Sequence, residues 1–453
     1  MYAQDKDNGY GLECKVTPTE NGFRLEGNFH ALVHVNNTDN ELDQIETQIE
    51  QIGQQLKRDL CRQTLETADE RNIQILQKTQ SQLIKNGKPP FTIVTKFGEV
   101  KLKRQQLRNT QTGTTMIPSA ILWQTSQHRH ITRQVTEAVC VASQSVSYRK
   151  ATRQLANEAG VEQLISTTTV WNKKQEKGQA LAQRQQDFVE QVLSQKEVTP
   201  PCGVPSQGTR RIEEATIQIQ LDEVKTKSQE PGKKMNLTYT ATLETSKREC
   251  FYLAASTSEQ LIQQVWAYLT VLGLLAGKRL EVLSDGARWI GDWVGSLSGV
   301  AVEHILCWYH LRKRIYESFG AFGFPKEKRK LLQHEILGHL WRGRTAQAVW
   351  ILWGLRSSAR VPDRITDLIG YLLRKRRVIV DYEVRRQSGL WKASTRVEKW
   401  NDLSITERCK HRGTSWTSSG VLAVALYAAE QKQTAQRPTP QTAQINFPTH
   451  TTN

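Results

Sequence analysis

The stretch Ile217-Gln218-Ile219-Gln220-Leu221-Asp222-Glu223-Val224 is the part of the sequence that decides the fold. Its apolar residues alternate with glutamines, and a period of two is typical of a β-strand. The pattern predicts that Asp222 stands at the far end of this strand. Such an aspartate usually begins a turn, but a strand end also holds a side chain firmly enough for metal binding. Asp222 is therefore a candidate metal ligand that needs partners elsewhere in the chain.

Residues 212–430 continue with an α/β order of elements. After residues 217–221 we expect strands at 236–243 and 250–254, a helix at 256–277, a strand at 280–283, a helix at 289–297 and a strand at 301–307. A capping box formed by Ser256 and Glu259 is expected to begin the first of these helices. Three antiparallel strands followed by helix, strand, helix and strand is the order of an RNase H-like domain, an inference by fold analogy.

Two more carboxylates stand in comparable positions. Asp285 follows the fourth expected strand, directly before Gly286, and Glu398 lies on a later expected helix. Asp285 could equally belong to an ordinary turn, and Glu398 could be a surface ion-pair residue, in which case Glu383 or Glu407 would supply the third acid. Carboxylates gathered in this way suit two Mg²⁺ ions about 4 Å apart, which is an arrangement that supports phosphoryl transfer.

The composition indicates a polyanionic partner. Lysine and arginine number 62 among 453 residues, against 45 acidic residues, which gives a formal net charge of +17. This excess favours nucleic acid over a membrane surface. No apolar stretch of about 18 residues could span a bilayer, and residues 1–11 lack the apolar core of a secretion signal. We therefore expect a cytoplasmic protein whose seven scattered cysteines are free thiols.

The N-terminal region and the C-terminal tail are expected to differ from this α/β region. Residues 1–90 are polar, with a strand-like piece at 29–35 and amphipathic helices from residue 41 and at 72–85. The first helix could form half of a coiled coil or, as Gly53 favours, pack on its own chain. Residues 91–104 predict a hairpin whose lysines contact phosphates or only water. A linker at 199–205 is expected to separate two domains, and residues 431–453 are expected to be disordered.

Residues 91–195 contain a possible DNA-reading pair of helices. One helix is predicted at 148–158, Gly160 suggests a turn, and Ser166 can cap a second helix. A separate polar helix is expected at 175–195. The second helix carries the candidate DNA-binding residues Thr168, Asn172, Lys173 and Lys174. Because the turn is longer than in most helix-turn-helix units, an ordinary helical hairpin is an equal alternative.

A helical insertion is expected at about residues 311–385, between the fifth strand and the last helix. It is rich in tryptophan and arginine and includes the run Arg374-Lys375-Arg376-Arg377. This run could bind the DNA backbone, where each phosphate contact adds salt-dependent affinity. The alternative is a bundle with a solvated basic face, and the net charge of the chain favours DNA contact.

Four motifs carry a resemblance to a known family. They are Leu221-Asp222-Glu223-Val224, Leu283-Ser284-Asp285-Gly286-Ala287, Cys307-Trp308-Tyr309-His310, and Val397-Glu398-Lys399-Trp400-Asn401-Asp402-Leu403 with Arg408-Cys409-Lys410 and Gly413-Thr414-Ser415-Trp416. Over roughly residues 90–430 the chain resembles bacterial insertion-sequence transposases of the DDE type. The nearest group is the Kra-type insertion sequences, which are distantly similar to Mutator-like transposases.

The resemblance implies a metal-dependent enzyme that cuts DNA at the ends of an element and joins the freed 3′-hydroxyl to target DNA. Asp222, Asp285 and Glu398 would be the catalytic residues and would hold two Mg²⁺ (or Mn²⁺) ions. Cys307 and His310 would lie near this site without being metal ligands, although a core cysteine and a helix-start histidine also explain them. The N-terminal half would recognise the terminal inverted repeats of double-stranded DNA, in a homo-oligomer at the bacterial nucleoid.

Two alternatives to an active transposase remain open. The family tends to have a Gly-Ser-Gly-like segment before the Val-Glu pair, whereas bulkier residues occupy positions 389–395 here. A catalytically decayed, transposase-derived DNA-binding protein is therefore one alternative. The other is an RNase H-like structure-specific nuclease, which would cut branched DNA without joining it.

Overall fold

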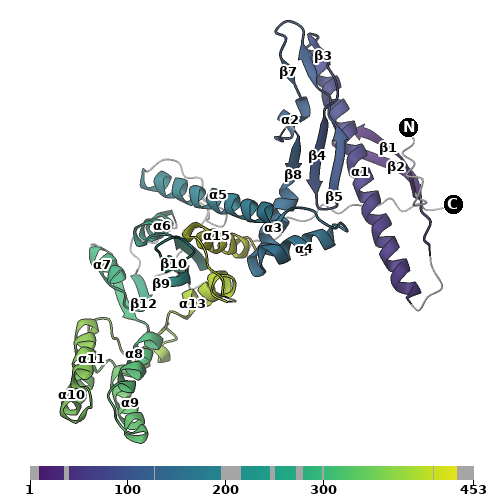
Figure 1. The fold of residues 1–453 in the computed structure, drawn as a ribbon. Coiled ribbons are helices and arrows are strands. Elements are labelled where there is room, and N and C mark those ends of the chain that lie inside the picture. The colour runs from purple at the N-terminus through teal and green to yellow at the C-terminus, as the bar shows by residue number, and fades with distance from the viewer. Residues whose placement is uncertain are drawn as a thin grey trace, which may run out of the picture. The chain divides into compact units, whose positions relative to one another are not determined.

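A computed structural model describes residues 10–34, 40–126, 128–194, 216–244, 250–271, 279–297, 300–411 and 413–435. The chain divides into two compact units, Met1–Lys174 and Gln175–Asn453, and each unit is described by itself. The architecture is mixed α/β, with long helices and several separate sheets (Figure 1).

The first unit contains small sheets and helices that come from the N-terminal part of the chain. In chain order these are β1 (Gly11–Thr19), β2 (Gly22–His30), α1 (Glu41–Thr79), β3 (Leu83–Lys85), β4 (Pro90–Thr95), β5 (Gly98–Lys103), β6 (Leu107–Asn109), β7 (Thr115–Met116), α2 (Pro118–Leu122), β8 (Arg129–Ile131), α3 (Arg133–Ser145), α4 (Tyr148–Glu158) and the start of α5 (Thr167–Leu193). β1 pairs with β2, and the orders β5-β4-β8 and β3-β6-β7 form two three-stranded sheets.

Several N-terminal predictions are wrong. A single 39-residue helix, α1, replaces the two expected helices, because one glycine such as Gly53 costs a helix only about 1 kcal/mol. Residues 83–85, expected at the end of the second helix, form strand β3. The N-terminal hairpin spans residues 11–30 rather than a strand at 29–35. The hairpin expected at 91–104 is confirmed as β4 and β5, with Gly98 at a φ of +118° in its turn.

Of the two helices predicted as a DNA-reading pair, the first has its predicted bounds and the second is longer than predicted. Helix α4 occupies the predicted residues 148–158. Gly160 has a φ of +61°, which glycine adopts without strain. The Ser166 hydroxyl accepts a hydrogen bond from the Thr169 N–H (3.1 Å), as expected of a cap. Helix α5 then runs unbroken to Leu193, so the separate helix expected at 175–195 is wrong, since strong helix formers occupy the junction.

The second unit contains one large sheet and many helices. In chain order, after the rest of α5, these are β9 (Thr216–Lys227), β10 (Met235–Glu244), β11 (Cys250–Ala255), α6 (Ser258–Val271), β12 (Arg279–Ser284), α7 (Arg288–Ser296), β13 (Ala301–Leu306), α8 (Trp308–Gly320), α9 (Lys326–Trp341), α10 (Thr345–Leu355), α11 (Pro362–Lys375), α12 (Tyr382–Gln387), α13 (Thr395–Asn401), α14 (Glu407–Cys409) and α15 (Ser418–Ala435). A π-helical turn at Asp402–Thr406 joins α13 to α14.

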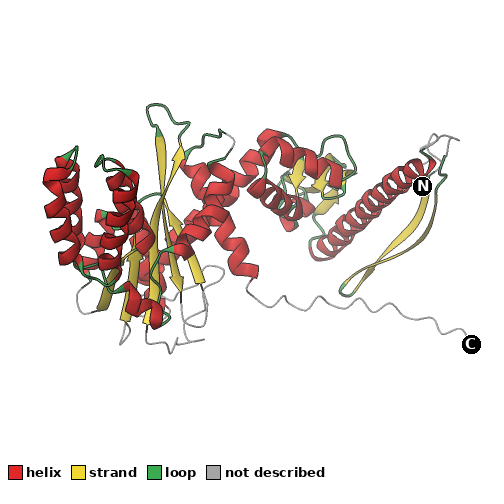
Figure 2. Ribbon diagram, turned by 90° about the horizontal axis from the view of Figure 1, so that it is seen from below, coloured by secondary structure: helices red, strands yellow, loops and turns green. Residues whose placement is uncertain are grey.

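Figure 2 shows the strands of the large sheet in yellow beside red helices. Their order in the sheet is β11-β10-β9-β12-β13. β9, β10 and β11 pair antiparallel, whereas β12 lies parallel to both β9 and β13. The sequence of strands and helices expected for this region is therefore confirmed. Helix α6 begins one residue later than its predicted capping box, because the Thr257 hydroxyl accepts from the Gln260 N–H (3.2 Å). The predicted end of this helix at 277 lies outside the described residues.

The position of Asp222 within its strand differs from the prediction. β9 does not end at Asp222 but continues beside β10 as far as Lys227. The pairing of β9 with β12 does stop there, because Leu221 opposite Ser284 is the last pair of that ladder. Asp222 is therefore paired with β10 on one side, whereas no residue of β12 pairs with it on the other side.

The two faces of the sheet are covered differently. Ile217, Ile219 and Leu221 of β9 are buried in a core that also contains residues of α5, α6 and α7. Leu283 of β12 belongs instead to a second core, formed with helices α8 to α12. These helices occupy the region where a helical insertion is expected at 311–385.

Two predictions concern residues near the limits of the described chain. The linker expected at 199–205 lies outside the described residues. Helix α15 extends to Ala435, so residues 431–435 are helical rather than disordered. Residues 436–453 of the expected tail lie outside the described residues.

A buried ion pair connects α12 to the sheet. Arg385 donates from Nη2 to Glu281 Oε2 of β12 at 2.8 Å, and the two side chains are 7% and 3% exposed. Arg385 Nη1 lies 3.5 Å from Glu303 Oε2, and Nε donates to the Trp391 carbonyl (2.9 Å). Because Trp391 lies just before α13, this arginine fixes the approach of that helix to the sheet.

Replacing Arg385 by alanine should lower the free energy of unfolding by about 3–5 kcal/mol, because the Glu281 carboxylate would stay buried without its main counter-charge. Urea denaturation followed by tryptophan fluorescence measures this change. Arg386→Ala is the matched control, since Arg386 is exposed on the same helix and should change stability by about 0.5 kcal/mol or less. Equal losses in the two variants would show that the buried pair is unimportant.

Candidate functional site

The register of the sheet brings Asp222 and Asp285 level with each other. The final pair between β9 and β12 is Leu221 with Ser284, and the next residue on each segment is an aspartate. Since the two strands are parallel, both chains reach this level in the same direction. Asp285 acts electrostatically on Asp222. The two aspartates predicted from the sequence are therefore brought together.

Helix α13 is attached to the same face of β9 by a glutamine of that strand. Gln220 Oε1 accepts hydrogen bonds from the backbone N–H groups of Arg396 (3.0 Å) and Val397 (3.2 Å) in the first turn of the helix. These N–H groups have no partner within a helix, so Gln220 satisfies them from the sheet. Side chains alternate along β9, so Gln220 and Asp222 lie on the same face. Because Gln220 bonds to the first turn of α13, the helix that carries Glu398 packs on this face.

Asp222 lies in a buried, hydrogen-bonded environment. Its Oδ1 accepts from the Glu223 N–H (2.9 Å), and its Oδ2 accepts from Asn401 Nδ2 (2.9 Å). Burial raises the pKa of the Asp222 carboxyl, and the charge of Asp285 acts in the same direction, whereas these hydrogen bonds and His310 oppose the rise. A cation bound beside the two carboxylates would remove their mutual repulsion.

Asn401 is a site residue that the sequence interpretation missed. Its Oδ1 accepts from the Tyr252 hydroxyl (3.0 Å) of β11, while its Nδ2 donates to Asp222. The amide therefore holds the Asp222 carboxylate in one orientation, and Tyr252 fixes the amide. A signal was present in the sequence, because Asn401 follows Glu398 by three residues and such residues share a helix face.

The loop that carries Asp285 is held by both its own backbone and the basic run. Asp285 Oδ1 accepts from the Ala287 N–H (2.8 Å), and Gly286 has a φ of +87°. Lys375 Nζ donates to the Gly286 carbonyl (2.7 Å). One member of the predicted DNA-binding run thus contacts the loop of a candidate catalytic residue.

The other members of that run differ in exposure from Lys375. Arg374, Arg376 and Arg377 are exposed at the end of α11, whereas Lys375 is half-buried. The three arginines are accessible to a phosphate backbone. Lys375 is occupied by the carbonyl of Gly286, so its part is to fix the Asp285 loop.

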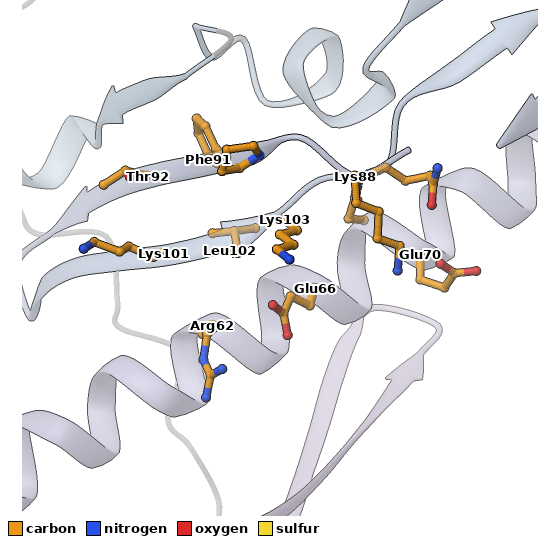
Figure 3. Close-up of a pocket in the computed structure, with 12 residues that line it drawn as sticks. Arg62, Glu66, Glu70, Lys88, Phe91, Thr92, Lys101, Leu102 and Lys103 are labelled. Atoms are coloured by element: carbon orange, nitrogen blue, oxygen red, sulfur yellow. Dashed lines mark hydrogen bonds between the residues drawn. The ribbon is translucent and has the colours of Figure 1, made fainter. Parts of the chain in front are cut away.

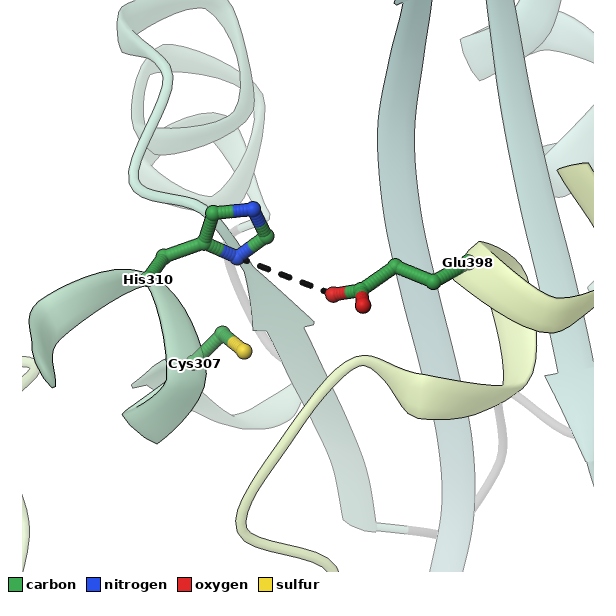
Figure 4. A group of neighbouring side chains, drawn as sticks. All are labelled: Cys307, His310 and Glu398. Carbon is green, nitrogen blue, oxygen red and sulfur yellow. Dashed lines mark ion pairs between the residues drawn. The ribbon is translucent and has the colours of Figure 1, made fainter. Parts of the chain in front are cut away.

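Glu398 is turned toward Cys307 and His310 (Figure 4). Its Oε1 lies 3.7 Å from His310 Nδ1 and accepts a hydrogen bond from the Ser394 hydroxyl (2.8 Å). The Ser394 N–H also donates to Cys307 Sγ (3.3 Å). Cys307 and His310, predicted to lie near the site, are therefore direct neighbours of Glu398.

The charges of this group influence one another. Burial alone would raise the pKa of the Cys307 thiol, but the approach of the His310 side chain and the hydrogen bonds from Ser394 lower it overall. The Cys307 sulfur raises the pKa of His310 against the effect of burial, and the Glu398 and Asp285 carboxylates add to the rise. The pKa of Cys307 is thus lowered and that of His310 raised, and each shift favours the charged form of its group.

The three predicted acids do not form one compact group of ligand atoms. Within the described ranges, the one set of three potential metal ligands with all ligand atoms within 4.8 Å of one another is Cys307, His310 and Glu398. The aspartates supply the hard oxygen donors that Mg²⁺ prefers, so the donor chemistry suits that ion. Of the alternative acids, Glu383 is paired with Arg342 (3.1 Å) and Glu407 is exposed on α14.

The predicted DNA-reading helix holds its candidates in different environments. Thr168 and Asn172 are exposed on α5, and Lys173 is half-buried. Lys174 is 1% exposed, and its Nζ donates to the Cys140 carbonyl (3.2 Å) and to Gln144 Oε1 (2.7 Å) of α3. The prediction that Lys174 contacts DNA is wrong in this structure, because it lies one helical turn after the buried Val170 and so faces the core.

The lysines of the β4–β5 hairpin line a pocket against α1 (Figure 3). Lys101 and Lys103 share this pocket with Arg62, Glu66 and Glu70. Acidic side chains from α1 therefore face the basic strand. This mixed charge makes the pocket a poorer phosphate site than the strand alone suggests.

Comparison with known proteins reaches only part of the chain. Residues 37–200 match the model of an uncharacterised protein family, UPF0236. This match covers less than half of the chain and does not include Asp222, Asp285 or Glu398. No curated protein matches the chain. None of the helices in the described ranges has the length and apolar character needed to cross a membrane.

Asn401→Leu should lower the free energy of unfolding by about 1–3 kcal/mol, because a buried carboxylate oxygen loses its donor and the Tyr252 hydroxyl loses this acceptor. Urea denaturation measures the loss. Asn172→Leu serves as the control at an exposed helical asparagine, with an expected change of about 0.5 kcal/mol or less. A loss at position 401 no larger than that of the control would contradict the positioning role of this amide.

Proposed function

We propose that this protein is a DDE transposase of the insertion-sequence type, which cleaves DNA at the ends of an element and transfers the strand to a target. The observation that carries the proposal is the level placement of Asp222 and Asp285, on the face to which Gln220 attaches the Glu398 helix. A further support is the strand order β11-β10-β9-β12-β13, with the first three strands antiparallel. We take this sheet to belong to an RNase H-like fold.

Asp222, Asp285 and Glu398 would hold two Mg²⁺ (or Mn²⁺) ions, which would activate the attacking hydroxyl and stabilise charge on the leaving oxygen. Asn401 would keep Asp222 oriented, and Lys375 would keep the Asp285 loop in place. Glu398 would need another rotamer to join the aspartates, since it now bonds to Ser394. The contacts of Glu398 with Ser394 and His310 would therefore have to break before Glu398 could complete the acidic site.

The DNA partner is supported by charge and by its distribution. The net charge of +17 favours a polyanion. The exposed Arg374, Arg376 and Arg377 flank Lys375, which contacts the Asp285 loop from the end of α11. We propose that these arginines bind target or end DNA and that Thr168, Asn172 and Lys173 take part in recognising the terminal inverted repeats. The protein would act as a homo-oligomer in the bacterial cytoplasm, at the nucleoid.

Asp222→Asn, Asp285→Asn and Glu398→Gln should each reduce cleavage and joining by at least about 10³-fold, because each removes a charged ligand of the proposed ions. The assay uses labelled DNA that carries the element's own ends, with Mg²⁺, and gel analysis of cut and joined products. Glu407→Gln, at an exposed glutamate, is the control and should retain activity.

The same assay separates the alternatives. Cleavage of branched DNA without joined products would instead identify a structure-specific nuclease. Tight binding to the ends with no cleavage by the wild type would identify a catalytically decayed DNA-binding protein, a reading that the orientation of Glu398 toward His310 favours. Full activity in Glu398→Gln with loss in the aspartate variants would assign the third acid elsewhere.

Arg376→Ala/Arg377→Ala should weaken DNA binding and reduce the slope of log affinity against log salt by about 2, close to 1 for each lost phosphate contact. Fluorescence anisotropy over a salt series measures the slope. Lys326→Ala/Lys330→Ala removes the same charge from exposed positions on α9 and should leave the slope nearly unchanged. Equal changes in both variants would show that only net charge matters.

A further inference from the structure

The beginnings of two helices meet at the Cys307 sulfur. Cys307 is the N-cap residue of α8, and Ser394 is the N-cap residue of α13. The Ser394 N–H donates to Cys307 Sγ (3.3 Å), and the Trp308 N–H donates to the Lys392 carbonyl (2.9 Å). These bonds tie the segment before α13 to the start of α8. The junction places side chains from distant parts of the sequence around one thiol.

Local helix geometry explains why Cys307 and His310 converge. A residue at the N-cap and the residue three positions later lie on the same side of the first turn, as in a capping box. Cys307 and His310 have this spacing in α8. Glu398, in the first turn of α13, is brought to the same place by Ser394, whose hydroxyl donates to its carboxylate.

The three side chains present a sulfur, an imidazole nitrogen and a carboxylate oxygen within 4.8 Å of one another. Figure 4 shows them directed toward a common point. Cys307 is buried, and the side chains of His310 and Glu398 are 27% and 29% exposed. His310 Nδ1 is itself buried, with Glu398 Oε1 at 3.7 Å and the Cys307 sulfur as its other polar neighbour. A metal ion among these three donors would give the nitrogen a closer partner than either side chain provides.

This donor set differs in kind from the aspartate pair. Mg²⁺ binds hard oxygen ligands, whereas Zn²⁺ accepts thiolate sulfur, imidazole nitrogen and carboxylate oxygen. Ligand atoms around a tetrahedral Zn²⁺ are about 3.3–3.8 Å apart, so small side-chain movements would complete the geometry. Three protein ligands would leave a fourth position for water.

We propose that Cys307, His310 and Glu398 form a binding site for a borderline-soft divalent metal ion, with Zn²⁺ as the natural occupant. The site stands on its own donor atoms and does not depend on the reaction proposed above. One consequence does rest on that reaction: a Zn²⁺ ion that holds Glu398 would keep it from the aspartates and so compete with Mg²⁺ for the acidic site.

A cluster without metal is the competing interpretation of the same geometry. In that case Cys307 and His310 contact each other, and Glu398 is held by Ser394 and the imidazole. Metal binding requires a thiolate and a neutral imidazole, so protons on these groups would be released to solvent. The two interpretations differ in a measurable way, since only one predicts a stoichiometric complex with a sulfur–metal bond.

The test is titration of the reduced, metal-free full-length protein with Zn²⁺ by isothermal calorimetry, and with Co²⁺ by absorption spectroscopy. We expect one tight Zn²⁺ per chain and, with Co²⁺, a thiolate-to-cobalt charge-transfer band. Cys307→Ser and His310→Ala should weaken Zn²⁺ binding on the order of 100-fold or more and abolish the band. Cys250→Ser removes another buried thiol of the same unit and should leave both signals intact.

The wild-type protein decides the matter even if a variant fails to fold. Absence of a thiolate–cobalt band in folded wild type would overturn the proposal, as would tight Zn²⁺ binding that survives Cys307→Ser. These readouts need no DNA and no Mg²⁺. The expected metal complex in a protein without strand-transfer activity would therefore refute the proposed function and support the Zn²⁺ site. Strand-transfer activity without the metal complex would support the proposed function and refute the Zn²⁺ site.

Discussion

The parallel pairing of β9 with β12 is the constraint on which the candidate site depends. The period of two along β9 assigns Ile217, Ile219 and Leu221 to one core and Gln218, Gln220 and Asp222 to the opposite face. The ladder with β12 ends at Leu221 and Ser284, so the next residues, Asp222 and Asp285, stand level at the end of the ladder. A shift of one residue in this register would reverse the faces of β9 and separate the two aspartates.

Polar residues on that face then attach the C-terminal helices. Gln220 caps α13, Asn401 bonds Asp222, and Glu281 holds Arg385 just before α13. Each of these bonds joins residues more than one hundred positions apart, and a buried polar atom without such a bond is destabilising. The same bonds that keep α13 on the sheet also fix the orientation of the candidate acids. Stability and site geometry therefore depend on one network.

Two kinds of donor meet at the end of this network. The aspartates offer hard oxygens beside a loop that Lys375 holds, whereas Cys307 and His310 offer softer donors at the start of α8. Glu398 contacts His310 of the second set in this structure. Its rotamer is the simplest conformational variable that would connect the two sites, since Ser394 and His310 hold it by only a hydrogen bond and a charge contact.

The sequence by itself determined the order of strands and helices from β9 to β13, because periods of two and of three to four are local properties that burial enforces. It also predicted that Asp222 and Asp285 follow comparable positions, and the resemblance to a known family implied that Cys307 and His310 lie near the candidate site. The prediction of element boundaries failed where the sequence has no strong stop signal. Examples are the single helix α1, the unbroken α5 and the length of β9. Only the tertiary structure decided that Lys174 is buried, that Asn401 holds Asp222 and that Glu398 turns toward His310. Those facts depend on contacts between residues far apart in the chain, and the spacing of residues along a sequence carries no direct record of them.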